Sequence, residues 1–232
     1  MKCVILCAGE GKRLGSDKPK ALQTVKGKTI LKHIAECWED CVDGFIVVIS
    51  PSRTDDFQPH LDSLSTLPVM GVIQEEPKGI ADAILSVEPW VDDKFVVALG
   101  DCMFRGIFRI PEDEKDGDMT LGVGVWLQGQ AADISAGYGV KMANQEALAL
   151  VEKPTSTADL RCGMGVYFLS SPVFDIIREA QPTPLRNEVE ITNVMQACIT
   201  SGMKVYAVPL DGQYYNINTP DDLVRVRNAW PK

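Results

Sequence analysis

The first hundred residues alternate between continuous apolar runs and amphipathic stretches. Continuous apolar runs of strand length cover residues 2–7, 44–50, 68–73 and 94–101. Helical spacing of apolar residues covers 29–40 and 79–90 and, more weakly, 55–64, where Pro59 interrupts the pattern. Because strands that are apolar on both faces alternate with helices, the pattern predicts a parallel sheet covered on both sides.

The pattern changes after residue 101. Strands are predicted at 118–127, 138–143, 147–153 and 162–169, with few helices between them, so antiparallel pairing is expected there. The remaining predicted elements are helices at about 171–180 and 188–201, a last strand at 204–210 and a C-terminal helix at 219–230. Thr219 would cap that helix, and Pro220 would lie in its first turn. We therefore expect one domain over residues 1–232, with halves of about 1–101 and 102–232 that share a sheet.

The net charge, the length of the apolar runs and the cysteine pattern argue against several classes of protein. A net charge of -9 argues against a broad nucleic-acid-binding surface. No apolar run approaches the roughly 18 residues of a membrane span, and no leader peptide is visible, so we expect a cytoplasmic protein without membrane partners. Seven cysteines without a C-x-x-C pair favour reduced, mostly buried thiols over disulfides or structural zinc. Homo-oligomerisation is left open.

The segment after the first strand carries the strongest chemical signal. "LCAGEGKRLGSDKPKAL" (6–22) combines three glycines with two basic clusters. A glycine-rich turn lets backbone N–H groups approach phosphate, and basic side chains neutralise its charge. The pattern is neither a P-loop nor a dinucleotide fingerprint. On its own, the segment is equally consistent with a solvated surface loop.

Six ordered motifs are similar to those of the sugar-1-phosphate nucleotidylyltransferases. The opening resembles their L-A-A-G-x-G-x-R-L and K-P-K-x-L signature, with Cys7 where alanine is usual. The further matches are "QEEPKGIADAI" (74–84), "LGD" (99–101), "YGV" with "VEKP" (138–140, 151–154), "NEVEITNV" (187–194) and "YNINTPDDL" (215–223). The resemblance spans nearly the whole chain. It implies a three-layer, Rossmann-like α/β fold with a mixed, mainly parallel central sheet.

The resemblance also implies a reaction and a set of site residues. A sugar 1-phosphate would attack the α-phosphorus of a nucleoside triphosphate, and pyrophosphate would leave. The implied catalytic residues are Arg13, on the departing pyrophosphate, and Lys20, on the α-phosphate. The implied nucleotide-binding residues are Leu6, Ala8, Gly9, Gly11, Gln74 and Gly79. The implied sugar-phosphate-binding residues are Gly139, Glu152, Lys153, Gly165 and Glu188.

Two positions are expected to hold the metal, and the Gln74 side chain is expected to face the base. Asp101 follows the fourth strand, where a carboxylate can hold Mg²⁺ between the phosphates of both substrates. Asn216 stands where many relatives have a second aspartate ligand. Gln74 offers an amide donor and an acceptor, which suits the edge of uracil or thymine, so UTP or dTTP is favoured.

Two alternatives remain. A cytidylyltransferase acting on a polyol or inositol phosphate would share the opening motif. A catalytically silent, nucleotide-sugar-sensing subunit would usually lack the arginine or the lysine, yet Arg13, Lys20 and Asp101 are all present. The segment "RCGMG" (161–165) is less polar than expected for an N-acetylhexosamine pocket, so the sugar stays open.

Overall fold

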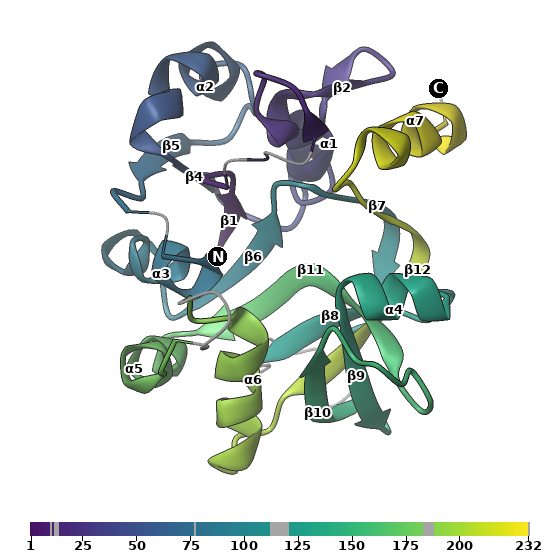
Figure 1. Ribbon diagram of the computed structural model, residues 1–232. Coiled ribbons are helices and arrows are strands. Elements are labelled where there is room, and N and C mark those ends of the chain that lie inside the picture. Colours follow the sequence, from purple (N-terminus) through teal and green to yellow (C-terminus); the bar gives the residue numbers. More distant parts are fainter. Residues whose placement is uncertain (10, 12–13, 77, 112–120, 183–187, 232) are drawn as a thin grey trace.

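A mixed ten-stranded sheet forms the centre of the protein (Figure 1). The computed structural model describes residues 1–9, 11, 14–76, 78–111, 121–182 and 188–231. The strand order is β5-β4-β1-β6-β11-β8-β12-β10-β9, with β7 paired to β12. Strands from both halves of the chain are therefore hydrogen-bonded into one sheet.

The first half contains the predicted parallel strands. They are β1 (Lys2–Leu6), β4 (Phe45–Ile49), β5 (Val69–Ile73) and β6 (Lys94–Leu99). The helices are α1 (Ile30–Glu36), α2 (Thr54–Leu61) and α3 (Ile80–Leu85), each shorter than expected. After α3 the chain continues in a 3₁₀ turn, Glu88–Trp90, because Pro89 has no N–H to extend an α-helix. The short hairpin of β2 (Thr24–Val25) and β3 (Lys28–Thr29) was not predicted.

The second half is mainly antiparallel, as expected. Its strands are β8 (Gly122–Trp126), β9 (Tyr138–Ala143), β10 (Glu146–Glu152) and β11 (Arg161–Ser170). Its helices are α4 (Ala131–Ala136), which was not predicted, α5 (Pro172–Glu179), α6 (Ile191–Thr200) and α7 (Pro220–Ala229). One pairing departs from the expectation, because β8 runs parallel to β12. Among the described residues, no helix is long and apolar enough to cross a membrane.

Two apolar clusters cover opposite faces of the sheet. On β1, Cys3 and Ile5 belong to one cluster and Val4 to the other, as the strand period requires. The first cluster includes buried residues of α1, α2 and α7, and the second includes those of α3, α5 and α6. This arrangement confirms the predicted three-layer fold. All seven cysteines are free, and five of them are buried.

The pairing of β7 (Cys102–Phe108) with β12 (Tyr206–Asn216) was missed by the sequence patterns. β6 ends at Leu99, and after a turn at residues 100–101 the chain enters β7. β12 extends six residues beyond the predicted end at residue 210 and pairs Asn216 with Cys102. The N–H of Ile217 then donates to the Asp101 carbonyl oxygen at 2.9 Å. The end of β12 therefore lies beside the end of β6.

Two facing glycines allow this pairing. Gly106 and Gly212 are register partners in β7 and β12. A Cβ on Gly106 would collide with the carbonyl oxygen of Asp211, and one on Gly212 would collide with that of Arg105. Gly106 also has a φ of 142°, which L side chains rarely adopt.

We expect Gly106→Ala to lower the free energy of unfolding by about 2–4 kcal/mol, because it adds backbone strain to a collision with main-chain atoms. Gly202→Ala is the control, since its φ is 86° but no atom lies within 4 Å of its Cβ position. The control should cost only about 1 kcal/mol. Chemical denaturation measures both, and equal losses would contradict the close approach of β7 to β12.

Candidate active site

A cavity of about 400 Å³ lies at the carboxyl ends of β1 and β6. The residues that line it are Leu6, Cys7, Ala8, Gly9, Gly11, Lys20, Ala21, Gln74, Gly79, Ile80, Ala83, Leu99, Gly100, Asp101, Glu188 and Glu190. They come from every predicted motif of the nucleotide-binding half and from the segment before α6. A second cavity of about 460 Å³, between α2 and the β4–β5 edge, contains none of the predicted site residues.

The opening loop forms one wall of the cavity. Leu6 ends β1, and its carbonyl oxygen accepts from the N–H of Gly100 at 2.9 Å, which joins the loop to the turn after β6. Gly11 has a φ of 61°, and a Cβ there would lie 3.0 Å from Cγ of Lys20. Glycine thus lets the lysine stem lie against the loop. Arg13, the other predicted catalytic residue, lies outside the described residues.

Lys20 connects segments that are far apart in the sequence. Its Nζ lies 3.0 Å from Oδ2 of Asp101 and 3.1 Å from Oδ1 of Asn218. Nδ2 of Asn218 donates in turn to Oδ1 of Asn216 at 2.7 Å. The Lys20 and Asp101 side chains are only 12% and 26% exposed, so water screens this ion pair less than a surface pair. The predicted metal ligands and the predicted catalytic lysine therefore belong to one polar network.

Two buried thiols flank Asp101. Burial raises the pKa of Cys7 and of Cys102 well above the ordinary range, and the Asp101 carboxylate raises both pKa values further. Both thiols are therefore neutral at physiological pH. Among the described residues, Lys20 is the cation that pairs with Asp101.

Gln74 is held at the side of the cavity below α3. It is 5% exposed, and its Nε2 donates to Oδ2 of Asp82 at 2.7 Å and to the Gly79 carbonyl oxygen at 3.1 Å. Gly79 has a φ of 100°, and a Cβ there would approach Cβ of Glu188 to 3.0 Å. The NH₂ group of Gln74, which was expected to donate to the base, is thus hydrogen-bonded within the protein. The amide oxygen of Gln74 remains for contact with a base.

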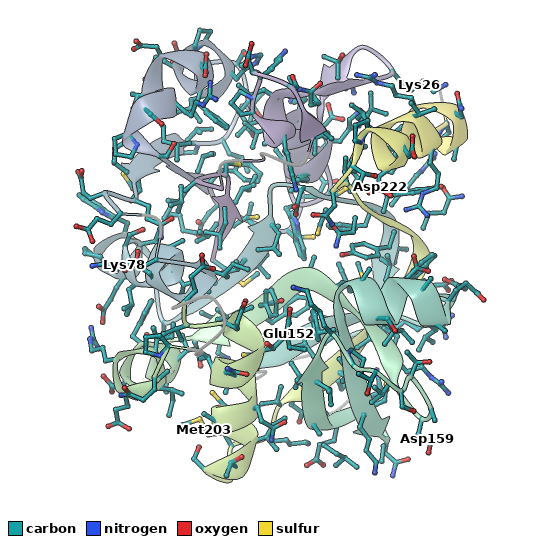
Figure 2. All side chains as sticks on the ribbon, viewed as in Figure 1. Lys26, Lys78, Glu152, Asp159, Met203 and Asp222 are labelled. Atoms are coloured by element: carbon teal, nitrogen blue, oxygen red, sulfur yellow. The ribbon has the colours of Figure 1, made fainter. Side chains whose placement is uncertain are left out.

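The predicted sugar-phosphate residues lie in the second half, outside the cavity lining except for Glu188. Oε2 of Glu152 accepts from the Thr192 hydroxyl at 3.2 Å, and Lys153 Nζ lies 3.8 Å from the other Glu152 oxygen. Figure 2 shows Glu152 near the middle of the molecule, beside α6. Because Thr192 and Glu190 both lie at the start of α6, that segment joins Glu152 to the wall of the cavity.

Both predicted glycines of this half are required by packing. A Cβ on Gly139 would lie 2.6 Å from Cδ1 of Leu160, and one on Gly165 would lie 2.9 Å from Cγ of Leu99. Leu99 lines the cavity, so Gly165 lies directly behind its wall. Gly139 is buried against Leu160 and Ile134. A sugar contact at either glycine stays a prediction.

Three residues of the site were not identified from the sequence. Asn218 lies two residues after Asn216 in the segment "YNINTPDDL", where Asn216 alone was singled out. Asp82 follows Gly79 by three residues, a spacing that brings it to the same side of α3, but its contact with Gln74 could not be read from spacing. Glu190 forms part of the "NEVEITNV" motif, where Glu188 alone was singled out.

The oxygen donors near Lys20 suit a hard cation. One carboxylate, from Asp101, and two amide side chains, of Asn216 and Asn218, meet there. In the part of the chain that the structure describes, no three His, Cys, Asp or Glu side chains converge as a metal site. Any ion bound here would therefore complete its coordination with water or with substrate oxygens.

A glycine-rich loop, a lysine and a carboxylate meeting at the carboxyl ends of parallel strands define a nucleotide-binding α/β protein. The profile of the nucleotidyl transferase family matches residues 2–232, and the chain belongs to this family. It is a nucleotidyltransferase. The family inferred from the six motifs is thereby confirmed.

Among curated proteins, the UTP–glucose-1-phosphate uridylyltransferase AglF of Haloferax volcanii is 31% identical, over 96% of this chain and 93% of AglF. The bifunctional protein GlmU of Methanococcus maripaludis is 28% identical over 99% of this chain. This match covers 54% of GlmU, so the chain spans about half the length of that relative.

Solved structures confirm the fold. An inositol-1-phosphate CTP transferase from T. maritima superposes with a TM-score of 0.80 at 19% identity, over 98% of this chain and 94% of that one. A UDP-glucose pyrophosphorylase in complex with UDP-glucose superposes with a TM-score of 0.79 at 19% identity, over 99% and 97%.

The cap of α7 generates a prediction for the Asn218 segment. Oδ2 of Asp222 accepts from the backbone N–H groups of Asn218 and Thr219 at 3.0 and 2.9 Å and from the Thr219 hydroxyl at 2.8 Å. Figure 2 shows Asp222 at the start of α7. Burial raises the pKa of Asp222, but these hydrogen bonds outweigh it and hold the pKa below its usual value.

Because its pKa is depressed in the folded state, Asp222 stabilises the fold above its unfolded-state pKa and loses that effect as pH falls through its folded-state pKa. We expect Asp222→Asn to cost about 1–2 kcal/mol of unfolding free energy at pH 7. The loss should shrink below about pH 4. The exposed neighbour variant Asp221→Asn should stay within about 0.5 kcal/mol. A loss independent of pH would contradict the cap.

Proposed function

We propose that the protein transfers a uridylyl or thymidylyl group from UTP or dTTP to a sugar 1-phosphate, with Mg²⁺, to give a nucleoside diphosphate sugar and pyrophosphate. The observation that carries the proposal is that Lys20, Asp101 and Gln74 line one cavity. The likeness to the uridylyltransferase AglF, over nearly the full length of both chains, supports it.

The reaction is one displacement at the α-phosphorus. A phosphate oxygen of the sugar phosphate forms the new P–O bond, and the bond from the α-phosphorus to the bridging oxygen of the β-phosphate breaks. Its electron pair leaves with pyrophosphate. Since the nucleophile is already an anion, no strong general base is needed. The obstacle is repulsion between anions, so catalysis requires positioning and positive charge.

Lys20 supplies such a charge at a fixed place. Its stem lies against Gly11 of the opening loop, and its ammonium group is held by two oxygen acceptors. An ammonium group has three hydrogens, so the third can be donated to an α-phosphate oxygen while the two protein acceptors are kept. The pair with Asp101 thus holds the lysine close to the reaction until substrate arrives.

Asp101 and Asn216 would hold the Mg²⁺ ion, which neutralises phosphate charge when bound. The donor set fits, because carboxylate and amide oxygens are ligands that Mg²⁺ accepts. The Lys20 ammonium group already lies against Asp101 and Asn218 and offsets the carboxylate charge, so we expect the ion to bind weakly without nucleotide. Asn218, which bonds Asn216, would orient the amide ligand.

A substrate matrix tests the proposal. UTP, dTTP, CTP, ATP and GTP are each combined with a panel of sugar 1-phosphates, polyol phosphates and inositol phosphate, and pyrophosphate release is measured. We expect release with UTP or dTTP and a sugar 1-phosphate. Release with CTP and a polyol or inositol phosphate would instead support the cytidylyltransferase alternative. No release with any pair would support a silent sensing subunit.

We predict that Lys20→Ala and Arg13→Ala each lower kcat by at least about 100-fold, because each removes charge that stabilises the transition state. Lys26→Ala is the matched control, since Lys26 is exposed in the β2–β3 turn, away from the cavity (Figure 2). Its kcat should stay within about twofold of wild type. A Lys20→Ala enzyme that keeps a third of the wild-type rate would remove Lys20 from the mechanism.

The metal assignment gives a separate prediction. Asp101→Asn should abolish activity at any practical Mg²⁺ concentration, because it removes the carboxylate of the site. Asn216→Asp should keep activity and tighten Mn²⁺ binding without nucleotide, measured by calorimetry, because it adds a charged ligand. Full activity in Asp101→Asn, or unchanged Mn²⁺ affinity in Asn216→Asp, would exclude the shared site.

A further inference from the structure

The orientation of the Gln74 amide is fixed by its two partners. Gln74 follows β5, and its backbone N–H donates to the Ile49 carbonyl oxygen at 2.9 Å. Its Nε2 lies 2.7 Å from Oδ2 of Asp82 and 3.1 Å from the carbonyl oxygen of Gly79. A carboxylate and a carbonyl only accept hydrogen bonds, so the NH₂ group, and not the oxygen, must face them.

This orientation leaves one polar atom for a ligand. An amide NH₂ has two hydrogens, and Asp82 and Gly79 accept one each. Among the described residues, none donates to Oε1 of Gln74. Since Gln74 lines the cavity and is 5% exposed, a base that contacts its side chain meets a buried acceptor with a fixed position.

We propose that Asp82 is a positioning residue that makes the cavity selective for a base with a ring N–H, uracil or thymine, over cytosine. The proposal rests on the proposed function. Asp82 is half-buried and is not part of the cavity lining, so it acts through Gln74. It lies on α3, next to Ala81 and Ala83, which are buried in the core below the helix.

The chemistry of the two bases explains the selectivity. N3 of uracil or thymine carries a hydrogen that Oε1 can accept. N3 of cytosine carries a lone pair, which would face the oxygen without a hydrogen between them. To donate to cytosine, the amide would have to rotate. Rotation breaks both bonds of Nε2 and turns Oε1 toward the Asp82 carboxylate, and such unpaired buried acceptors are costly.

The test measures binding of UTP and CTP with Mg²⁺ by calorimetry, so it needs no sugar substrate. The wild-type protein should bind UTP at least about 30-fold more tightly than CTP. Asp82→Ala frees the amide to rotate and should reduce this ratio at least about fivefold. Asp82→Asn keeps an oxygen acceptor for Nε2 and should keep the ratio within about threefold of wild type. Asp55→Ala removes the same charge from the exposed first turn of α2 and is the control.

Each outcome decides the matter. The proposal is overturned if wild type binds CTP as well as UTP, if Asp82→Ala weakens both by the same factor, or if Asp82→Asn loses as much selectivity as Asp82→Ala. Asp82→Leu, which has the branching of aspartate but no acceptor, gives the same comparison should Asp82→Ala not fold. If the predicted ratios appear but no substrate pair releases pyrophosphate, the selectivity stands and the proposed function fails.

Discussion

Seven residue pairs join β7 to β12, and the geometry of the site depends on them. They carry Asn216 and Asn218 to the end of β6, more than one hundred residues earlier in the chain, where Ile217 bonds the Asp101 carbonyl oxygen. Lys20 then closes the arrangement from a third segment, the opening loop. The two glycines that let β7 and β12 approach are thus as important for the site as the residues that line it.

The charges of the cavity lining explain why a metal belongs to the proposal. The described lining carries one cation, Lys20, and three acids, Asp101, Glu188 and Glu190. A bare triphosphate would meet repulsion from these carboxylates at short range. A triphosphate that arrives with Mg²⁺ brings part of its own neutralisation, and its oxygens supply the ligands that two protein side chains leave free.

The layers of the fold and most strands could be predicted from the sequence, because a continuous apolar run of strand length indicates a strand that is buried on both faces. Prediction failed at β7, where "CMFRGIF" (102–108) is interrupted by Arg105 and Gly106 and shows no clear period. The predicted end of β12 was also too early, because Asp211 and Gly212 are residue types that are typical of a turn. Contacts such as Gln74 with Asp82, or Lys20 with Asn218, depend on which side-chain atoms face each other, and spacing along the chain does not encode that. The motifs therefore identified residues that line the cavity, whereas the hydrogen bonds that join Lys20 to Asn218 and Asn216 became visible only in the structure.

The most direct measurement is a crystal structure of the protein with Mg²⁺ and a UTP analogue that cannot be cleaved between its α- and β-phosphates. We predict that Lys20 Nζ contacts the α-phosphate, that Asp101 and Asn216 bind the ion together with phosphate oxygens, and that the uracil N3–H donates to Oε1 of Gln74. A complex with the nucleotide in the cavity but the ion on other residues, and with Lys20 still on Asn218 and away from phosphate, would contradict this account.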